Sequence, residues 1–272
     1  MKKFLALVLA ALMVFAFVAC NGTGKDNNGA SNASDTSDTS DTTEKATLIM
    51  ATNAAFPPYE YKEGESFAGI DVEIAGKIAE KLGMTLEIKD VEFGSIIGGV
   101  QTGKFDIGMA GMTVTDERLK SVNFSDSYAT GIQVVIVKAD SEIKSLDDLK
   151  GDGSMKFGVQ QDTTGDIYAS DTVENGGYGK DNVVRYKTGA DAVQALKTGK
   201  VDAVIIDNEP AKSFVKANEG LSILDGDWVK ENYAIAIAKE NTELLEKVNG
   251  ALKELIADGT VKAIIDKYIP AE

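Results

Sequence analysis

The sequence predicts an α/β protein built from largely parallel sheets. The prediction rests on two observations: short apolar or β-branched runs alternate with segments of helical periodicity from Thr47 onward, and the alternation repeats through the second half of the chain. Strands that alternate with helices of this length are typical of parallel β–α–β units. The chain has 272 residues, 43% of them apolar, which is enough for one large domain or two modest ones.

The first half of the pattern begins with Thr47–Thr52, an apolar run that suits a buried strand. An amphipathic helix is predicted over Ile70–Leu82, because apolar residues recur at every fourth position and Gly83 follows as a stop. A further helix is expected to start at Thr115, where an N-cap residue is followed by two acids. The other predicted elements of this half are the strands Thr85–Asp90, Asp106–Ala110 and Val134–Val137 and a short helix over Ser95–Gln101.

The second half repeats this rhythm. Its predicted elements are the strand Lys156–Gln160, a helix from about Gly165, the strand Val183–Tyr186, the helix Ala190–Thr198, the strand Ala203–Asp207, the helix Ala211–Asn218, the strand Ala234–Ala238 and two helices split by Asp258-Gly259.

One heptapeptide pattern occurs in both halves. Val100–Asp106 (VQTGKFD) is similar to Leu196–Asp202 (LKTGKVD), and each reads as a helix end, a turn and a strand start. Two lobes of similar construction would explain the match; a chance match of common turn chemistry is the alternative. Ligands of open α/β sheets bind at the carboxyl ends of strands, which here are Gly111–Thr113 and Asp207.

The first 45 residues differ from the rest in composition. Lys2 and Lys3 precede the apolar run Phe4–Ala19, which is shorter than the roughly 20 residues of a spanning helix, so residues 1–19 are predicted to be a signal peptide. Residues 21–45 contain no large apolar side chain and are expected to be disordered.

The only cysteine, Cys20, directly follows the apolar run and a small residue. This arrangement resembles the lipobox of bacterial lipoproteins, which implies lipid attachment at Cys20. The protein would then be held at the extracytoplasmic face of the cell membrane, with residues 20–45 as its tether. An ordinary secretory signal with an incidental cysteine is the alternative.

Composition excludes several classes of function. The chain has no histidine and one cysteine, so neither a His/Cys zinc site nor a nucleophile activated by histidine can form. Its formal charge of −15 argues against a nucleic-acid partner. No metal, cofactor or catalytic residue is predicted.

Six motifs in this order resemble those of type II solute-binding proteins of ABC importers, in the polar amino acid branch. They are Ala51–Tyr59 (ATNAAFPPY), Gly69–Val72 (GIDV), Ala110–Arg118 (AGMTVTDER), Phe124–Tyr128 (FSDSY), Gly158–Gly165 (GVQQDTTG) and Val201–Asp207 (VDAVIID). The resemblance covers about Thr47–Ile269.

The resemblance implies a two-lobed, periplasmic-binding-protein-like fold of type II. Each lobe would be a mostly parallel sheet flanked by helices, and the lobes would close like a hinge around the ligand. Two hinge crossings are placed near Tyr128–Gln133 and Glu231–Ala234. Lobe 1 would then comprise residues 46–131 and 232–272, and lobe 2 residues 132–231.

The implied function is capture of a free polar L-amino acid and its delivery to an ABC permease, by a monomer that is not an enzyme. The ligand would be neutral or cationic, of the glutamine, arginine, lysine or histidine class. One alternative is a fold-related enzyme such as a cyclohexadienyl dehydratase, whose acid chemistry would rest on Asp or Glu alone. The other is a sensor-type ligand-binding module, which would need a second membrane segment and an output domain; neither is expected.

An amino acid is a zwitterion, so its site needs a fixed cation and a fixed anion. Arg118 is the candidate cation, because a guanidinium matches a carboxylate through two parallel N–H donors. The resemblance adds Thr113, Gly111 and Thr164 as carboxylate contacts. A surface arginine paired with nearby acids is the alternative for Arg118.

Asp207 is the candidate anion for the ligand ammonium, since it ends an apolar strand where an unpartnered acid would be costly. The resemblance adds Gly111 to this contact. A helix N-cap is the alternative role for Asp207.

The resemblance places Phe56 and Phe93 on either side of the ligand side chain, although core packing is a serious alternative for Phe93. Asn53 and Gln160 complete the side-chain contacts. Asn53 stands where many relatives carry Asp, which suits a neutral polar ligand. Glu60 and Asp71 are near enough in sequence to keep a cationic ligand open.

Overall fold

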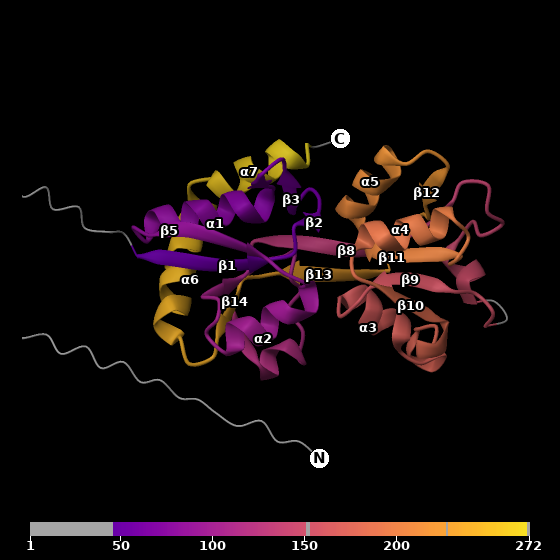
Figure 1. Cartoon of the computed structure of the whole chain (residues 1–272), viewed down its shortest axis with the longest axis horizontal. Coiled ribbons are helices and arrows are strands. Elements are labelled where there is room, and N and C mark those ends of the chain that lie inside the picture. The colour runs from indigo at the N-terminus through magenta and orange to yellow at the C-terminus, as the bar shows by residue number, and fades with distance from the viewer. Residues whose placement is uncertain (1–45, 151–152, 227, 271–272) are drawn as a thin grey trace, which may run out of the picture. The chain divides into compact units, whose positions relative to one another are not determined.

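A five-stranded sheet in the order β5-β1-β6-β14-β7 forms the first part of the computed structural model (Figure 1). Its strands are β1 (Thr47–Thr52), β5 (Thr85–Asp90), β6 (Ile107–Gly108), β7 (Val122–Phe124) and β14 (Ala236–Ala238). The strand β1 runs parallel to β5 and β6, whereas β14 runs antiparallel to β6 and β7. The structure describes residues 46–150, 153–226 and 228–270, so the predicted signal peptide, Cys20 and tether lie outside the described residues.

A second, six-stranded sheet has the order β10-β9-β11-β8-β12, with β13 also paired to β8. Its strands are β8 (Ala129–Lys138), β9 (Phe157–Gln160), β10 (Val183–Tyr186), β11 (Ala203–Asp207), β12 (Leu221–Ile223) and β13 (Val229–Tyr233). The strands β9, β10 and β11 are parallel, and every partner of β8 is antiparallel to it.

The predicted α/β class is confirmed; both sheets are mixed, which differs from the expectation of mostly parallel sheets. The expectation rested on strands that alternate with helices, and such units do pair in parallel here. It did not anticipate strands that follow one another without a helix, such as β7, β8 and β13. Together with β14, these strands supply the antiparallel pairs of the two sheets.

Helices flank both sheets. They are α1 (Ile70–Lys81), α2 (Ile96–Gln101), α3 (Thr164–Ser170), α4 (Gly189–Lys197), α5 (Asn208–Ala217), α6 (Thr242–Ala257) and α7 (Thr260–Tyr268). Short 3₁₀ turns occupy Phe93–Ser95, Arg118–Lys120, Leu146–Lys150, Val173–Asn175 and Lys180–Asn182.

Two helix predictions need correction. The helix expected from Thr115 is only the 3₁₀ turn Arg118–Lys120, because the β-branched strand β7 begins two residues later. The helix α5 begins at Asn208 rather than Ala211, since Pro210 falls in its first turn, where the missing N–H carries no penalty. A small antiparallel sheet was also not predicted; its strands are β2 (Ala55–Phe56), β3 (Glu60–Glu63) and β4 (Ser66–Ala68).

The long strand β8 and its partner β13 belong to the second sheet and extend from it toward the first sheet (Figure 1). They pair from Ala129 with Tyr233 to Gln133 with Val229, across both predicted hinge crossings. All described residues belong to one compact unit. The lobe boundaries remain a prediction, with β8 and β13 as the connection between the sheets.

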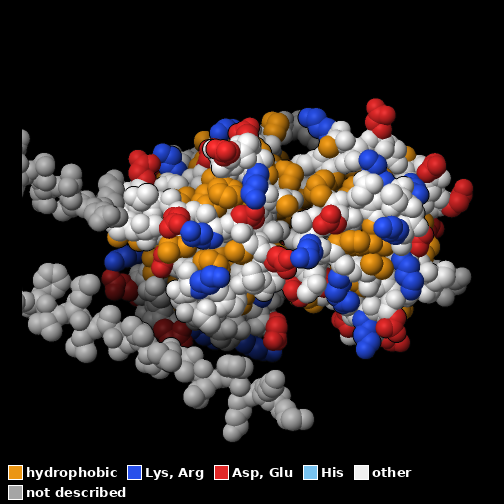
Figure 2. All heavy atoms as spheres, viewed as in Figure 1, with side chains coloured by type: hydrophobic (Ala, Val, Ile, Leu, Met, Phe, Trp, Pro, Cys, Tyr) orange, Lys and Arg blue, Asp and Glu red, His pale blue; other side chains and the backbone are white. Residues whose placement is uncertain are grey.

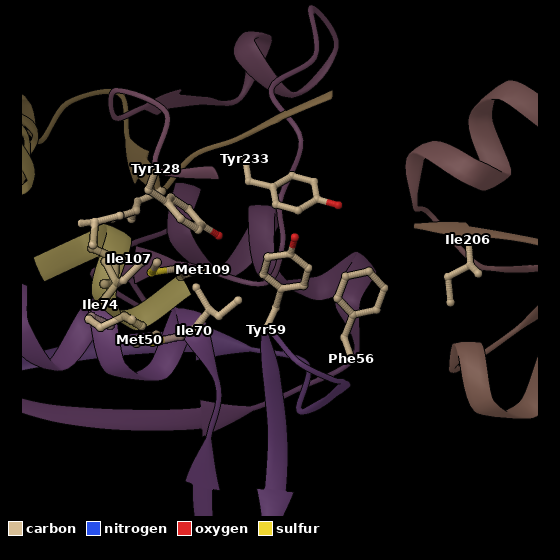
Figure 3. Close-up of a cluster of buried hydrophobic side chains, with 14 of the residues drawn as sticks. Met50, Phe56, Tyr59, Ile70, Ile74, Ile107, Met109, Tyr128, Ile206 and Tyr233 are labelled. Atoms are coloured by element: carbon tan, nitrogen blue, oxygen red, sulfur yellow. The ribbon is translucent and has the colours of Figure 1, made fainter. Parts of the chain in front are cut away.

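The face of α1 that carries Ile70, Ile74 and Ile78 is completely buried, as its spacing predicts. Figure 3 shows Ile70 and Ile74 of this face beside Met50 and Met109. The rings of Tyr59, Tyr128 and Tyr233 lie next to them, and Ile206 lies apart at the right of the view. No helix in the described ranges is long and apolar enough to span a membrane. Acidic and basic side chains are interspersed over the face shown in Figure 2.

Candidate ligand-binding cavity

All the ligand contacts predicted from the sequence line one cavity. Its lining residues are Asn53, Phe56, Glu60, Phe93, Ala110, Gly111, Thr113, Arg118, Gln160, Thr163, Thr164 and Asp207. Several lie where a strand ends: Asn53 follows β1, Gln160 ends β9 and Asp207 ends β11. The carboxyl ends of strands from both sheets therefore meet at this cavity.

Arg118 is buried in the wall of the cavity, with 9% of its surface exposed. Its Nη1 donates to the carbonyl of Thr113 at 2.7 Å, and its Nη2 donates to the carbonyl of Asp162 at 3.1 Å. The guanidinium carbon lies 5.2 Å from the centroid of the Phe93 ring. This burial excludes the surface-arginine alternative. It lowers the pKa of Arg118 from its ordinary value, against the opposing charges of Glu231 and Asp207, but an arginine remains charged in proteins.

Asp207 is buried at the end of β11 and accepts a hydrogen bond from the hydroxyl of Tyr233. Burial and the nearby charge of Glu231 together raise the pKa of Asp207 to about 7, against the opposing effect of hydrogen bonds from Tyr233 and Gln133. Asp207 occupies the N-cap position of α5, but its side chain makes no capping hydrogen bond. The N-cap alternative therefore does not account for this carboxylate.

The Gly111 N–H donates to Oδ2 of Asp71 at 2.8 Å, and the hydroxyl of Tyr128 donates to the same oxygen at 2.9 Å. The amide of Gly111 is thus already engaged, which differs from the expectation that it donates to the ligand carboxylate. Gly111 has a φ of +50°, and a Cβ there would lie 2.9 Å from the Phe56 ring. This position therefore requires glycine.

Glu60 lines the cavity with 1% of its surface exposed, and its carboxyl group is hydrogen-bonded to the buried carboxyl group of Asp71. Burial raises the pKa of Glu60 well above its ordinary value, and the neighbouring Asp71 raises it further. Burial also raises the pKa of Asp71 to about 7, despite hydrogen bonds from Gly111 and Tyr128. A cation beside two adjacent buried carboxyl groups favours their ionised forms, so this wall of the cavity is suited to a cationic group.

The side chains of Asn53 and Gln160 bind each other across the cavity. Nε2 of Gln160 donates to Oδ1 of Asn53 at 2.8 Å, and Nδ2 of Asn53 donates to the carbonyl of Val91 at 2.8 Å. The Phe56 ring is buried and stacks near Tyr59, whereas Phe93 is only partly buried and lies beside Arg118. The contact with Arg118 distinguishes Phe93 from an ordinary core residue.

Sequence reasoning missed a buried polar group on the two connecting strands. Gln133 of β8 donates through Nε2 to Glu231 of β13 at 2.9 Å and to the hydroxyl of Thr164 at 3.4 Å. Tyr233 donates to Asp207, and Figure 3 shows its hydroxyl pointing toward the side of Ile206. A signal existed for Gln133, since it is a polar residue in the otherwise apolar run Ile132–Val137.

Comparisons with known proteins agree with this geometry. A family model for bacterial extracellular solute-binding proteins, family 3, matches residues 48–271. The arginine-binding extracellular protein ArtP of Bacillus subtilis is 35% identical over 275 residues, which span 100% of both chains. A solved structure of an ancestral arginine-binding protein bound to glutamine is 40% identical, with a TM-score of 0.75, and the match covers 84% of this chain and 99% of that chain.

A third similar protein bears on the enzyme alternative. It is an ancestral amino-acid-binding protein described as a precursor of cyclohexadienyl dehydratase, at 33% identity and a TM-score of 0.74, covering 82% of this chain and 95% of that chain. Its name describes a binding protein, as do the other two. The three similar proteins described here are thus all named as binding proteins.

Proposed function

The chain belongs to family 3 of the bacterial extracellular solute-binding proteins, and on that premise we propose that it captures a polar L-amino acid outside the cytoplasm and delivers it to an ABC importer. The observation that carries the proposal is a buried arginine and a buried aspartate in the wall of one cavity. A zwitterion supplies the opposite charge to each. Binding between two hinged lobes would bring Thr164 and Asp207 toward Arg118 and exclude water from the ligand.

We assign the ligand carboxylate to Arg118, Thr113 and Thr164, and the ligand ammonium to Asp207 and Gly111. Because its N–H is engaged by Asp71, Gly111 would contribute its carbonyl oxygen to the ammonium. Phe56 and Phe93 would hold the side-chain stem, and Asn53 and Gln160 would contact its polar end.

Among the candidate ligands, the cavity favours a cationic side chain. The support is the buried carboxyl pair formed by Glu60, in the wall of the cavity, and Asp71, whose ionisation a guanidinium or ammonium would favour. The relatives add support, since one is named for arginine and another is an arginine-binding protein bound to glutamine. We therefore place arginine first, with lysine and histidine next, and glutamine as the neutral candidate that the Asn53–Gln160 pair would suit.

A thermal-shift screen of the twenty L-amino acids tests this proposal. At 100 times its dissociation constant, a ligand stabilises the folded state by about 2.7 kcal/mol, which for a chain of this size raises Tm by roughly 5–11 °C. L-arginine is expected to give the largest shift and D-arginine little or none. A screen in which no amino acid raises Tm would refute amino acid capture.

We further propose that residues 1–19 are a signal peptide and that Cys20 carries the lipid which anchors the monomeric protein to the extracytoplasmic face of the membrane. The support is the apolar run that ends in a small residue and Cys20. Two acyl chains suffice for stable anchoring, whereas one does not.

Replacing Cys20 by serine is expected to move the protein from the membrane fraction to the medium or periplasm, since the side chain to be acylated is lost. Cell fractionation with an antibody against the folded part measures this distribution. Retention of the variant in the membrane fraction would contradict lipidation at Cys20.

A further inference from the structure

The chain uses arginine twice among its 28 basic side chains, at Arg118 and Arg185. Lysine serves everywhere else, so these positions stand out as places where a planar, multiply bonding cation is required. Arg118 lines the cavity, and Arg185 lies on β10 with 39% of its side chain exposed. The two arginines are nevertheless the two ends of one continuous set of hydrogen bonds.

The outer part of this network is centred on Asp166, in the first turn of α3. Nε of Arg185 donates to Oδ2 of Asp166 at 2.9 Å, and Nη2 of Arg185 donates to the hydroxyl of Ser170 at 2.7 Å. That hydroxyl donates to the other oxygen, Oδ1, of Asp166 at 2.8 Å. Only 6% of the Asp166 surface is exposed, and both of its carboxylate oxygens accept hydrogen bonds.

The inner part of the network runs through the backbone of Asp162. Its N–H donates to Oδ2 of Asp166 at 3.1 Å, while its carbonyl accepts from Nη2 of Arg118 at 3.1 Å. Both polar groups of this one peptide segment are therefore occupied, one by each half of the network. Asp166 and Arg118 are coupled through a single residue.

The conformation of Asp162 is unusual. It has a φ of +65°, and it is the only non-glycine residue with positive φ in the described ranges. A non-glycine residue holds this left-handed conformation only where its surroundings enforce it. The side chain of Asp162 also packs against Gly94, where a Cβ would lie 2.1 Å from Oδ2 of Asp162. The turn at Asp162 is thus held on one side by Asp166 of α3, and on the other side it packs closely against Gly94.

We propose that Asp166 and Arg185 are positioning residues for recognition of the ligand carboxylate. They hold the Asp162 turn so that its carbonyl, together with that of Thr113, fixes the plane of the Arg118 guanidinium. With two acceptors occupying one N–H on each Nη, the remaining N–H groups are oriented for the ligand carboxylate when the two lobes are closed. This inference rests on the proposed function of the cavity, since it assumes that Arg118 receives the carboxylate.

The first test uses labelled protein saturated with unlabelled L-arginine, so that the lobes are closed, and NMR of the protein's own arginine side chains. With only two arginines in the chain, the two guanidinium groups can be assigned from a single Arg185→Lys spectrum. Rotation about the Nε–Cζ bond of Arg118 is expected to be slow in the wild type and at least about tenfold faster in Asp166→Asn, because the variant releases the turn. The matched control is Asp266→Asn, the same chemical change at the exposed Lys262–Asp266 pair on α7.

The second test compares L-arginine with L-argininamide, which keeps both cationic groups but lacks the carboxylate. Calorimetry should show that Asp166→Asn raises the dissociation constant of L-arginine by about tenfold. The dissociation constant of L-argininamide should stay within twofold of its wild-type value. Slow rotation retained in Asp166→Asn, or an equal loss for the two ligands, overturns the inference. If no amino acid binds the wild type, the proposed function fails; if L-arginine binds the wild type but Arg118 rotation is as slow in Asp166→Asn, only this inference fails.

Two substitutions of Asp162 separate its backbone from its side chain. Asp162→Gly and Asp162→Ala both remove the carboxylate, but only glycine adopts positive φ without strain. Asp162→Gly is expected to bind L-arginine about fivefold more tightly than Asp162→Ala, from the usual cost of the left-handed region. Equal affinities of the two variants would show that the backbone conformation is irrelevant and would overturn the inference.

Discussion

Replacing Arg118 by alanine is expected to abolish amino acid binding while leaving the fold in place. Arg118 is the only cation among the described residues that line the cavity, and it carries the proposed contact with the ligand carboxylate. Removing one member of a buried, hydrogen-bonded charge pair costs about 2–5 kcal/mol, or a factor of about 30 to 4000 in the dissociation constant. Isothermal titration calorimetry with the best ligand from the screen measures this loss.

The fold should survive because the Arg118 side chain bonds to two backbone carbonyls and holds no core residues together. Circular dichroism should be unchanged, with a modest loss in Tm from two carbonyls that lose a donor. Arg118→Lys is the control. It keeps the positive charge but loses the two parallel N–H donors of the guanidinium, so its affinity should lie between those of wild type and Arg118→Ala. Undiminished affinity in Arg118→Ala would place the carboxylate elsewhere.

The sequence was most informative where local physics decides the outcome. The helix α1 follows from the apolar spacing of Ile70, Ile74 and Ile78, and its end follows from Gly83. The strands β1 and β11 follow from continuous apolar runs that only a buried strand can use. These elements carry Asn53 and Asp207 to the cavity, so much of the site was within reach of sequence reasoning.

The sequence failed where long-range pairing decides the outcome. The register that joins β8 to β13 brings Gln133 and Glu231 together from 98 residues apart, and no local pattern encodes such a pairing. The engaged amide of Gly111 also could not be foreseen, since its partner Asp71 lies on α1, 40 residues earlier. The family resemblance predicted the roles of the site residues, whereas only the structure shows which of their polar groups are already hydrogen-bonded to other residues.

Affinity for the amino acid is expected to fall as pH drops below about 7, with a slope that Asp207→Asn reduces. The ligand ammonium binds the ionised form of Asp207, whose pKa is raised to about 7 by burial and by Glu231. Below that pKa the carboxyl group must release its proton on binding, so the dissociation constant rises by up to about tenfold per pH unit for this one group. Calorimetry from pH 5 to 8 in buffers of different ionisation enthalpy measures both the affinity and the released proton.

The stability of the ligand-free protein should change in the opposite sense. The folded-state pKa values of Asp207 and Asp71, both about 7, lie above the unfolded value of about 3.9. The folded state therefore binds more protons between these values, and the stabilisation present below pH 4 is lost as pH rises toward 7. Tm of the ligand-free protein should fall over this window, while the Tm shift caused by the ligand should grow. A ligand-free Tm that rises from pH 5 to 7 would contradict these ionisation states.

Asp207→Asn also reveals which charge the ligand side chain carries. In this variant Glu60 and Asp71 remain the acids beside the cavity, and burial still raises the pKa of both. A cationic side chain placed against Glu60 favours ionisation of that pair, so the variant should retain part of the pH slope and release a proton on binding. A neutral ligand side chain does not favour ionisation of Glu60 and Asp71. The affinity of Asp207→Asn for such a ligand should therefore not change from pH 5 to 8. The slope that remains after Asp207 is neutralised therefore distinguishes an arginine or lysine ligand from glutamine by a titration alone.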